Sequence, residues 1–219
     1  MIVCKFGGTS VASAEQIKKV ANIVKSNPER KIVAVSAPGK RSSDDIKVTD
    51  LLIDLADTAL AGGDVESKID VVVNRYRAIT DGLGLDHTMT DIIAADLRER
   101  VEADRSNTDL FIDSIKASGE DNNAKVIASY FNSIGLPAKY VSPKEGLVVN
   151  DLPERTFALP EAYTNLSKLK DSQEIIVFPG FFGYTKTGVL RTFDRGGSDI
   201  TGSILASAVG AKLYENFTD

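Results

Sequence analysis

The sequence predicts an α/β domain of three layers, α/β/α, around a mainly parallel sheet. An apolar run at residues 1–4 ends at a glycine pair, and a helical pattern follows it. A second apolar, β-branched run occupies residues 31–37, which is typical of a buried parallel strand. Strand, helix and strand in this order form a βαβ unit. The 219 residues are enough for one domain with a substantial core.

Capping and breaking residues predict the bounds of the first two helices. Ser13 begins the first helix with a capping-box pattern, and Pro28 lies just beyond its end. Thr49 can cap the second helix, which Gly62 closes. A polar stretch between the second strand and this helix is expected to be a surface loop.

From residue 64 to residue 119 the apolar residues keep a helical spacing, so the α/β alternation lapses. We expect a helical excursion here that forms one wall of a ligand cleft. A new helix is expected to begin at Gly119 and Glu120 and to end at Gly135. The later elements are predicted as short strands at 138–141 and 146–149, a short helix near 163–169, a buried strand at 174–178, a hairpin across 183–190 and a helix at 200–209.

Composition excludes several classes of function. The net charge of -5 argues against nucleic acid or an anionic membrane as the main partner. One cysteine and one histidine leave no disulfide framework and no Cys/His zinc cluster. Cys4 is expected to be a small buried hydrophobe, and His87 is expected to be solvated without a role. No leader precedes the first strand and no uncharged run approaches ~20 residues, so we expect a cytoplasmic protein.

The turn after the first strand, KFGGTS at residues 5–10, suits an anion. Glycines let the backbone approach a ligand, and the N-terminus of a following helix attracts negative charge. Lys5 adds a mobile positive charge at the same place. The pattern matches neither a Walker loop nor a dinucleotide fingerprint, and a glycine pair after a strand is by itself an ordinary turn.

A second turn of the same kind lies at residues 195–199, RGGSD. A strand-like segment at 189–193 precedes it, and a helical pattern of small residues follows it. In a doubly wound sheet such turns gather at the carboxyl ends of the strands, where ligands bind. We therefore expect the two turns to face a common ligand.

Five motifs in this order resemble the aspartate kinases of the amino acid kinase superfamily, over essentially the whole chain. They are KFGGTS at 5–10, VSAPG at 35–39, SGE at 118–120, PGFFG at 179–183 and RGGSD at 195–199. The resemblance implies an amino acid kinase fold, like that of carbamate kinase. It also implies transfer of the ATP γ-phosphoryl group, with Mg2+, to the side-chain carboxylate of L-aspartate. The product, 4-phospho-L-aspartate, begins lysine, threonine and methionine biosynthesis, and the parent protein is expected to be a homo-oligomer.

The resemblance also assigns roles to residues. Lys5 would stabilise charge on the transferred phosphoryl group, and Asp199 would orient Lys5 or organise the magnesium-nucleotide site. From the residues alone, Asp199 could equally be a carboxylate at a helix N-terminus, and Glu120 a capping carboxylate. The implied nucleotide-binding residues are Lys5, Gly7, Gly8, Thr9, Ser10, Ser36, Gly39, Thr218 and Asp219. The implied substrate-binding residues are Thr49, Glu120, Phe182, Arg195, Gly196, Gly197 and Ser198.

An acidic amino acid needs a cation and an anion besides the phosphate machinery. Arg195 has the planar fork that suits a carboxylate, and Glu120 would receive the substrate ammonium. Asp194 departs from the family, in which a small residue usually precedes this arginine. Its carboxylate either pairs with Arg195 or points to solvent, and the sequence leaves both alternatives open.

The family pattern continues beyond the last residues of this chain into the rest of a nucleotide site. The resemblance therefore implies that residues 1–219 are the amino-terminal part of a catalytic domain, without ACT regulatory domains. Such a piece is expected to turn over slowly or not at all. Two alternatives stay open: a non-catalytic fragment that binds a small acidic ligand, or a kinase of the same superfamily acting on glutamate, acetylglutamate, carbamate or UMP.

Overall fold

A parallel sheet of five strands lies at the centre of the computed structural model, which describes residues 1–194 and 196–218. The strand order is β3-β4-β2-β1-β7, and every neighbouring pair is parallel. The predicted mainly parallel sheet is thereby confirmed. The strands are β1 (Ile2–Phe6), β2 (Arg30–Val35), β3 (Ala138–Tyr140), β4 (Ile175–Pro179) and β7 (Leu213–Phe217).

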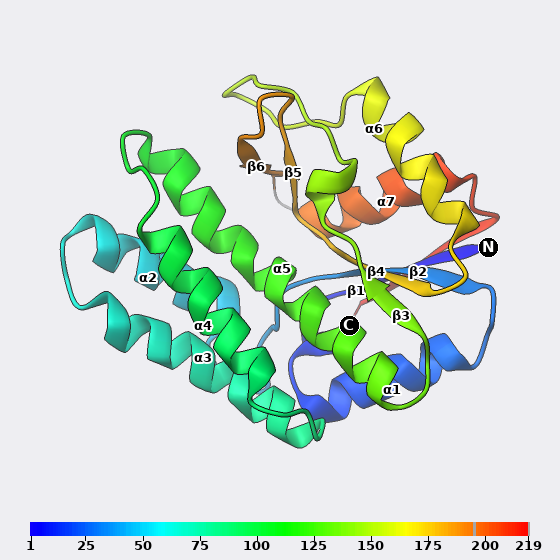
Figure 1. Cartoon of the computed structure of the whole chain (residues 1–219), viewed down its shortest axis with the longest axis horizontal. Helices are drawn as coiled ribbons and strands as arrows, with labels where there is room; N and C mark the ends of the chain where they lie inside the picture. Colours follow the sequence, from blue (N-terminus) through cyan, green and yellow to red (C-terminus); the bar gives the residue numbers. More distant parts are fainter. Residues whose placement is uncertain (195, 219) are drawn as a thin grey trace.

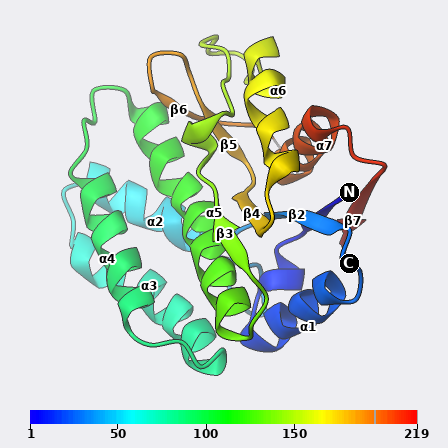
Figure 2. The ribbon, with the colours of Figure 1, turned by 45° about the vertical axis from the view of Figure 1, so that its right-hand side comes forward.

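Alternate side chains of the strands enter two separate hydrophobic cores. In β1, Cys4 and Phe6 belong to the core beneath α1 (Ala14–Lys25) and α5 (Thr108–Ser133), whereas Val3 belongs to the core beneath α6 (Pro160–Leu166) and α7 (Gly197–Val209). Figures 1 and 2 show these helices on opposite sides of the sheet. The three-layer α/β/α architecture is confirmed.

Three further helices form the predicted helical excursion. They are α2 (Val48–Leu60), α3 (Val65–Gly82) and α4 (Thr88–Val101), which lie beside α5 and away from the sheet (Figure 1). Their apolar faces join the core beneath α5, with Leu52, Tyr76 and Ile93 almost fully buried. The excursion therefore extends one core and adds no separate domain boundary.

The helix expected to begin at Gly119 is instead the middle of α5, which runs unbroken for 26 residues. A Cβ atom on Gly119 would lie 2.8 Å from the Ala37 Cβ and 3.1 Å from the Leu52 Cδ1. The missing side chain lets α5 pack tightly on the end of β2, and this packing outweighs the weak helix propensity of glycine. The predicted helix start was wrong for this reason.

The predicted caps had mixed outcomes. Ser13 is the N-cap of α1 and accepts a hydrogen bond of 3.3 Å from the Gln16 backbone, as predicted. Thr49 does not cap α2, because the helix begins at Val48 and Lys47 takes the N-cap position. Cys4 is fully buried, as predicted for a small buried hydrophobe. Burial is the main cause that raises the pKa of its thiol to about 12, and the neighbouring Glu215 adds to the effect.

The remaining elements complete the second side of the sheet. The predicted hairpin is formed by β5 (Phe182–Tyr184) and β6 (Leu190–Thr192), with Gly188 at a φ of 86° in its turn. The strand expected at 146–149 is reduced to isolated bridges at Val148 and Val149. Short 3-10 helices occupy Thr9–Val11, Pro143–Glu145 and Ser167–Asp171. Across the described residues, no helix is long and apolar enough to span a membrane.

Candidate active site

A cavity of about 230 Å³ lies at the carboxyl ends of β1 and β2. In open parallel sheets, ligands bind at this edge. The cavity collects side chains from β1, the loop after β2, the first turn of α2, the middle of α5 and the start of α7. Its lining residues are Lys5, Ser36, Thr49, Glu120, Phe181, Asp194, Gly196, Gly197, Ser198 and Asp199. Lys5 of the first predicted glycine motif and residues 196–199 of the second therefore line one cavity.

Lys5 and Asp199 form an ion pair inside this site. The Lys5 Nζ lies 2.7 Å from the Asp199 Oδ1, and the lysine side chain is only 8% exposed, against 49% for the aspartate. Every residue of β1 is buried, and this packing fixes the aliphatic part of the Lys5 side chain. The Asn216 side chain also donates a hydrogen bond of 3.1 Å to the Asp199 Oδ1. An ammonium group is thereby fixed in a poorly hydrated place, where its charge acts strongly on a ligand.

The two glycine turns after β1 and β2 touch backbone to backbone. The Gly39 N–H donates to the Gly8 carbonyl over 2.8 Å, and a Cβ on Gly39 would lie 2.6 Å from the Gly8 carbonyl carbon. Gly8 itself has an ordinary helical φ of -57°. These glycines are therefore required for close approach of one turn to the other.

The first turn differs from the predicted anion cradle. Only a three-residue 3-10 helix follows it, and α1 begins later, at Ala14. The Gly7 N–H donates to the Phe217 carbonyl over 3.1 Å and is therefore engaged by the backbone. Gly7 remains close to Lys5, since a Cβ there would lie 3.5 Å from the Lys5 Nζ. Six predicted nucleotide residues are not among those that line the cavity: Gly7, Gly8, Thr9, Ser10, Gly39 and Thr218.

Glu120 is a buried carboxylate that faces the cavity from the middle of α5. The residue is 6% exposed, and its Oε2 has no hydrogen-bond partner. Burial raises its pKa to about 8, against the opposing effects of a hydrogen bond from the Ala37 backbone and of nearby Lys116. The capping alternative is wrong because Glu120 lies twelve residues into the helix. A buried, unpartnered acceptor at a cavity wall is suited to a cationic ligand group.

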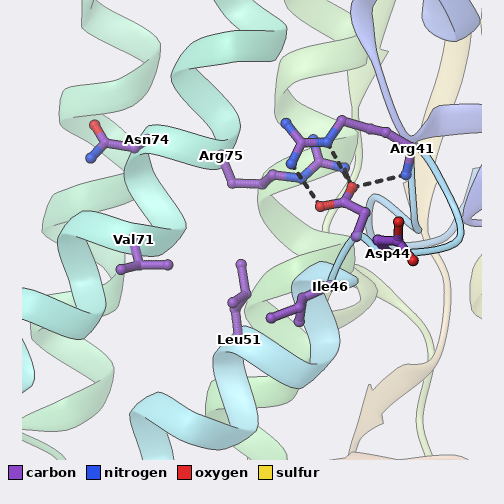
Figure 3. A pocket seen from close by; sticks show the side chains of 8 residues that line it. Arg41, Asp44, Ile46, Leu51, Val71, Asn74 and Arg75 are labelled. Atoms are coloured by element: carbon purple, nitrogen blue, oxygen red, sulfur yellow. Dashed lines mark hydrogen bonds and ion pairs between the residues drawn. The ribbon is translucent and has the colours of Figure 1, made fainter.

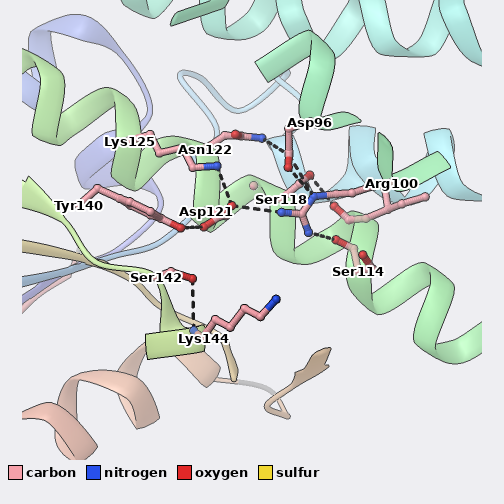
Figure 4. Close-up of polar contacts among 12 residues, drawn as sticks. Asp96, Arg100, Ser114, Ser118, Asp121, Asn122, Lys125, Tyr140, Ser142 and Lys144 are labelled. Carbon is pink, nitrogen blue, oxygen red and sulfur yellow. Dashed lines mark hydrogen bonds and ion pairs between the residues drawn. The ribbon is translucent and has the colours of Figure 1, made fainter. Parts of the chain in front are cut away.

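A buried polar network lies on α5 directly beside Glu120. Asp121 accepts hydrogen bonds from Arg100 (3.1 Å), Lys125 (2.9 Å) and the Tyr140 hydroxyl, and Arg100 also pairs with Asp96 at 3.0 Å. Figure 4 shows these side chains converging from α4, α5 and β3. The network fixes α5 against its neighbours at the level of the cavity.

The start of α7 forms the opposite wall. Gly196 is the N-cap with a φ of 83°, and Gly197, Ser198 and Asp199 make up the first turn. A Cβ on Gly197 would lie 2.7 Å from the Phe181 ring, which shows how closely this turn approaches the aromatic residue. The backbone N–H groups of a helix start favour an anionic ligand group here.

The aromatic residue of the site is Phe181, whereas Phe182 was predicted. Phe182 is fully buried in β5, while Phe181 lines the cavity, with the Lys116 Nζ 5.7 Å from its ring centre. Phe181 has a φ of 83°, which is strained for a residue with a side chain. The two phenylalanines are adjacent and look alike in sequence, so only the backbone reversal at Phe181 distinguishes them.

Sequence reasoning thus identified most of the lining, and missed Phe181. Asp194, noted as a departure, is exposed and also lines the cavity. Arg195 and Asp219 lie outside the described residues, so their predicted roles stay predictions. Within the described ranges, no three His, Cys, Asp or Glu side chains are grouped so that they could share a metal ion.

The fold and this cavity together define an α/β domain with a small polar cavity at the carboxyl edge of its parallel sheet. The sequence model of the amino acid kinase family matches residues 1–219, and the chain belongs to that family. The chain is 51% identical to aspartokinase 3 of Bacillus subtilis over 220 residues, which cover all of this chain and 48% of the relative. It is 27% identical to an aspartokinase of Chlamydia trachomatis, again covering 48% of that protein.

Solved structures give the same result. The aspartate kinase of Clostridium acetobutylicum matches with a TM-score of 0.86 and 33% identity over all of this chain and 47% of that one. Aspartokinase III of E. coli, in complex with aspartate and ADP, matches with a TM-score of 0.84 and 25% identity over all of this chain and 49% of that one. The chain thus spans about half the length of the relatives described here.

Proposed function

We propose that this chain carries the amino acid site and part of the phosphoryl-transfer site of an ATP-dependent aspartate kinase. The reaction is transfer of the γ-phosphoryl group to the side-chain carboxylate of L-aspartate. One observation carries the proposal: a single small cavity is lined both by the buried Lys5, which is paired with the half-exposed Asp199, and by Glu120, whose Oε2 has no hydrogen-bond partner. The similarity to aspartokinases supports it.

Lys5 and Asp199 are proposed to serve the phosphoryl group. Phosphoryl transfer depends on positioning and on stabilising charge at the moving group, and little covalent chemistry is required of the protein. The Lys5 ammonium is held by the Asp199 carboxylate, so it needs little reorganisation when an anion arrives. We propose that Ser36 and the two glycine turns complete this side of the site.

Glu120 is proposed to bind the substrate ammonium. A carboxylate with a pKa near 8 is largely protonated at neutral pH, and an arriving ammonium group favours its ionised form. Ser198 and the start of α7 are proposed to receive a carboxylate, together with Arg195. Thr49 and Phe181 would limit the space beside the amino acid. A cavity of about 230 Å³ suits a substrate of this size.

Nucleotide binding and Mg2+ are part of the proposal. Mg2+ is usually held by one or two carboxylates together with substrate phosphates, so a single well-placed carboxylate is sufficient from the protein. The Asp199 side chain fits this requirement because it is half exposed beside Lys5. When bound, the ion would neutralise charge on the phosphates. Thr218 and Asp219, with Gly7, Gly8, Thr9, Ser10 and Gly39, are proposed to lie on the nucleotide side.

The proposal is tested by titration calorimetry with L-aspartate, L-glutamate, N-acetylglutamate and UMP. We expect selective binding of L-aspartate, weakened at least tenfold in Glu120→Gln and in Arg195→Ala. Lys19→Met, an exposed change on α1, is the matched control and should bind normally. Equal binding of glutamate, or binding of UMP alone, would contradict the proposed substrate.

A further inference from the structure

Arg75 is a buried cation outside the candidate active site. It lies on α3 with 6% of its surface exposed, between the two glycine turns and the loop that follows Gly39. Its Nη2 donates to the Ala12 carbonyl over 2.8 Å and to the Gly39 carbonyl over 2.9 Å. One guanidinium nitrogen therefore joins the segment after β1 to the segment after β2.

The two bonded carbonyls belong to the same pair of turns whose backbones touch. Gly39 also donates to Gly8 over 2.8 Å, and Ala12 donates to Thr9 over 3.3 Å. Gly39 thus bonds Gly8 through its N–H and Arg75 through its carbonyl, while the same Arg75 nitrogen also reaches the end of the first turn at Ala12. A planar guanidinium with several N–H donors can serve two carbonyls at once, whereas an ammonium group on a flexible stem is less suited to this geometry.

The loop after Gly39 supplies an anion, Asp45, near this cation. Figure 3 shows Arg41 of the same loop beside Arg75. Asp45 accepts from the Arg41 backbone (2.9 Å), Nε (2.6 Å) and Nη2 (2.7 Å), and the same carboxylate lies 3.6 Å from the Arg75 Nη2. The Arg75 Nε and Nη1 are buried without a hydrogen-bond partner. Burying a guanidinium with unpaired N–H groups is unfavourable, so the contacts that Arg75 does make must compensate for that cost.

We propose that Arg75 is a positioning residue that holds the two glycine turns together for phosphate binding. It acts through the backbone of Ala12 and Gly39 and has no place in the cavity lining. The inference rests on the proposed function, because it assigns these turns to the nucleotide. It predicts that loss of Arg75 weakens nucleotide binding while L-aspartate binding changes little.

Hydrogen exchange tests the positioning without any ligand. In Arg75→Ala we expect the amides of Val11, Ala12 and Gly39 to exchange at least tenfold faster, because their hydrogen bonds close the two turns. Arg77→Ala removes an exposed arginine from the same helix and should leave these rates unchanged. Arg75→Lys keeps the charge, and should give intermediate rates if Ala proves too unstable to study. Unchanged exchange in both Arg75 variants would overturn the inference.

Chemical rescue separates positioning from general stability. Arg75 itself lines a cavity of about 410 Å³, which gives a small cation access to the vacated place. The other lining residues are Arg41, Asp44, Asp45, Ile46, Leu51, Val71 and Asn74. Low millimolar methylguanidinium should restore slow exchange and ADP binding in Arg75→Ala, whereas methylammonium at the same concentration should not. If methylguanidinium restores neither slow exchange nor ADP binding, Arg75 has only a general structural role and the inference is overturned.

ADP and L-aspartate titrations then distinguish the two proposals. Weaker ADP binding with normal L-aspartate binding in Arg75→Ala supports positioning. If the amides of the two turns exchange faster in Arg75→Ala but ADP binding is unchanged, the positioning role is overturned. If the unsubstituted chain binds neither ligand, the proposed function fails, while the exchange and rescue data still decide whether Arg75 holds the turns.

Discussion

At the scale of single residues, the cavity takes its cation from Lys5, its buried acceptor from Glu120 and its aromatic wall from Phe181. Lys5 was predictable because a lysine in an apolar strand before a glycine pair is chemically conspicuous. Phe181 was not, because the alternation of side chains between two faces says nothing about a residue at the reversal between β4 and β5. The burial of Glu120 was also hidden, since it depends on how α5 passes Ala37 and on the packing space that Gly119 leaves.

Glu120 should make stability depend on pH. Its folded-state pKa of about 8 lies above the usual value of 4.5, so the folded chain favours the protonated form. The corresponding stabilisation is complete below pH 4.5 and is lost as pH rises through 8. The Glu120→Gln variant cannot ionise at this position. Near pH 4.5 its free energy of unfolding should match that of the unsubstituted chain. At pH 8.5 the free energy of unfolding of Glu120→Gln should exceed that of the unsubstituted chain by on the order of 5 kcal/mol, because each unit of pKa difference corresponds to about 1.4 kcal/mol.

Urea unfolding at the two pH values measures this difference. A constant difference between the variant and the unsubstituted chain, independent of pH, would mean that the carboxyl group is not strongly perturbed. Bound L-aspartate should reduce the pH dependence of the unsubstituted chain, because the substrate ammonium stabilises the ionised carboxylate.

Gly39 and Gly7 form a matched pair for testing the contact between the turns. Gly39→Ala places a Cβ 2.6 Å from the Gly8 carbonyl carbon and 2.8 Å from the Thr9 nitrogen, so two backbones must separate. Gly7→Ala meets nothing closer than 3.5 Å. We expect Gly39→Ala to lower the free energy of unfolding by about 1–3 kcal/mol more than Gly7→Ala, measured by urea unfolding. Similar losses in both would show that the turns do not need this close approach.

At the scale of elements, periodicity predicted helices better than strands. The helical spacing of apolar residues in α2, α3 and α4 can be read from the sequence. The buried strands β1, β2 and β4 appear there only as short apolar runs. The strand β7 was missed because it is a half-exposed edge strand with Glu215 and Asn216 in its centre. Its pairing with β1 is a long-range contact that no local pattern encodes.

The Asp121 network should be important for the placement of α5. Asp121→Ala leaves Arg100 with Asp96 as its remaining acidic partner and removes the acceptor of Lys125 and Tyr140. Breaking a buried pair from one side leaves uncompensated charge, and we expect a loss of about 3–5 kcal/mol in the free energy of unfolding. Urea unfolding of the purified variant gives this value.

The exposed pair of Asp54 with Lys68 is the control for that measurement. Both side chains are more than a third exposed, so Asp54→Ala should cost under about 1 kcal/mol. A loss in Asp121→Ala no larger than this control would mean that hydrophobic packing alone sets the position of α5. The position of Glu120 in the cavity would then not depend on the ion pairs of Asp121.

At the scale of the molecule, the cavity joins parts that pack on both sides of the sheet. Glu120 comes from the helices over one core and Ser198 from α7 over the other. The sequence predicted the parallel sheet through βαβ reasoning, but the strand order arises from pairings between distant segments. The general rule about strand ends placed the two glycine motifs at the same edge of the sheet, where Lys5 and Asp199 form an ion pair; that the two turns face a common ligand stays a prediction.

Ligand binding should therefore stabilise the whole chain against unfolding. At an L-aspartate concentration 100 times its dissociation constant, the free energy of unfolding should rise by about 2.7 kcal/mol. Urea unfolding with and without ligand measures this change. Glycine, which lacks the side-chain carboxylate, is the control and should have little effect. Equal stabilisation by both compounds would show that the side-chain carboxylate is not recognised.

The position of β1 between β2 and β7 has a consequence for synthesis of the protein. The β1 strand pairs with β2 early in the chain, but its other neighbour is some 211 residues away. At ~5–20 residues per second, a ribosome needs roughly 10–40 s to make that partner. During this time the apolar strand that carries Lys5 has one open edge, which can pair with another chain. The strand that carries Lys5 thus keeps an unpaired edge until the last strand of the sheet has been made.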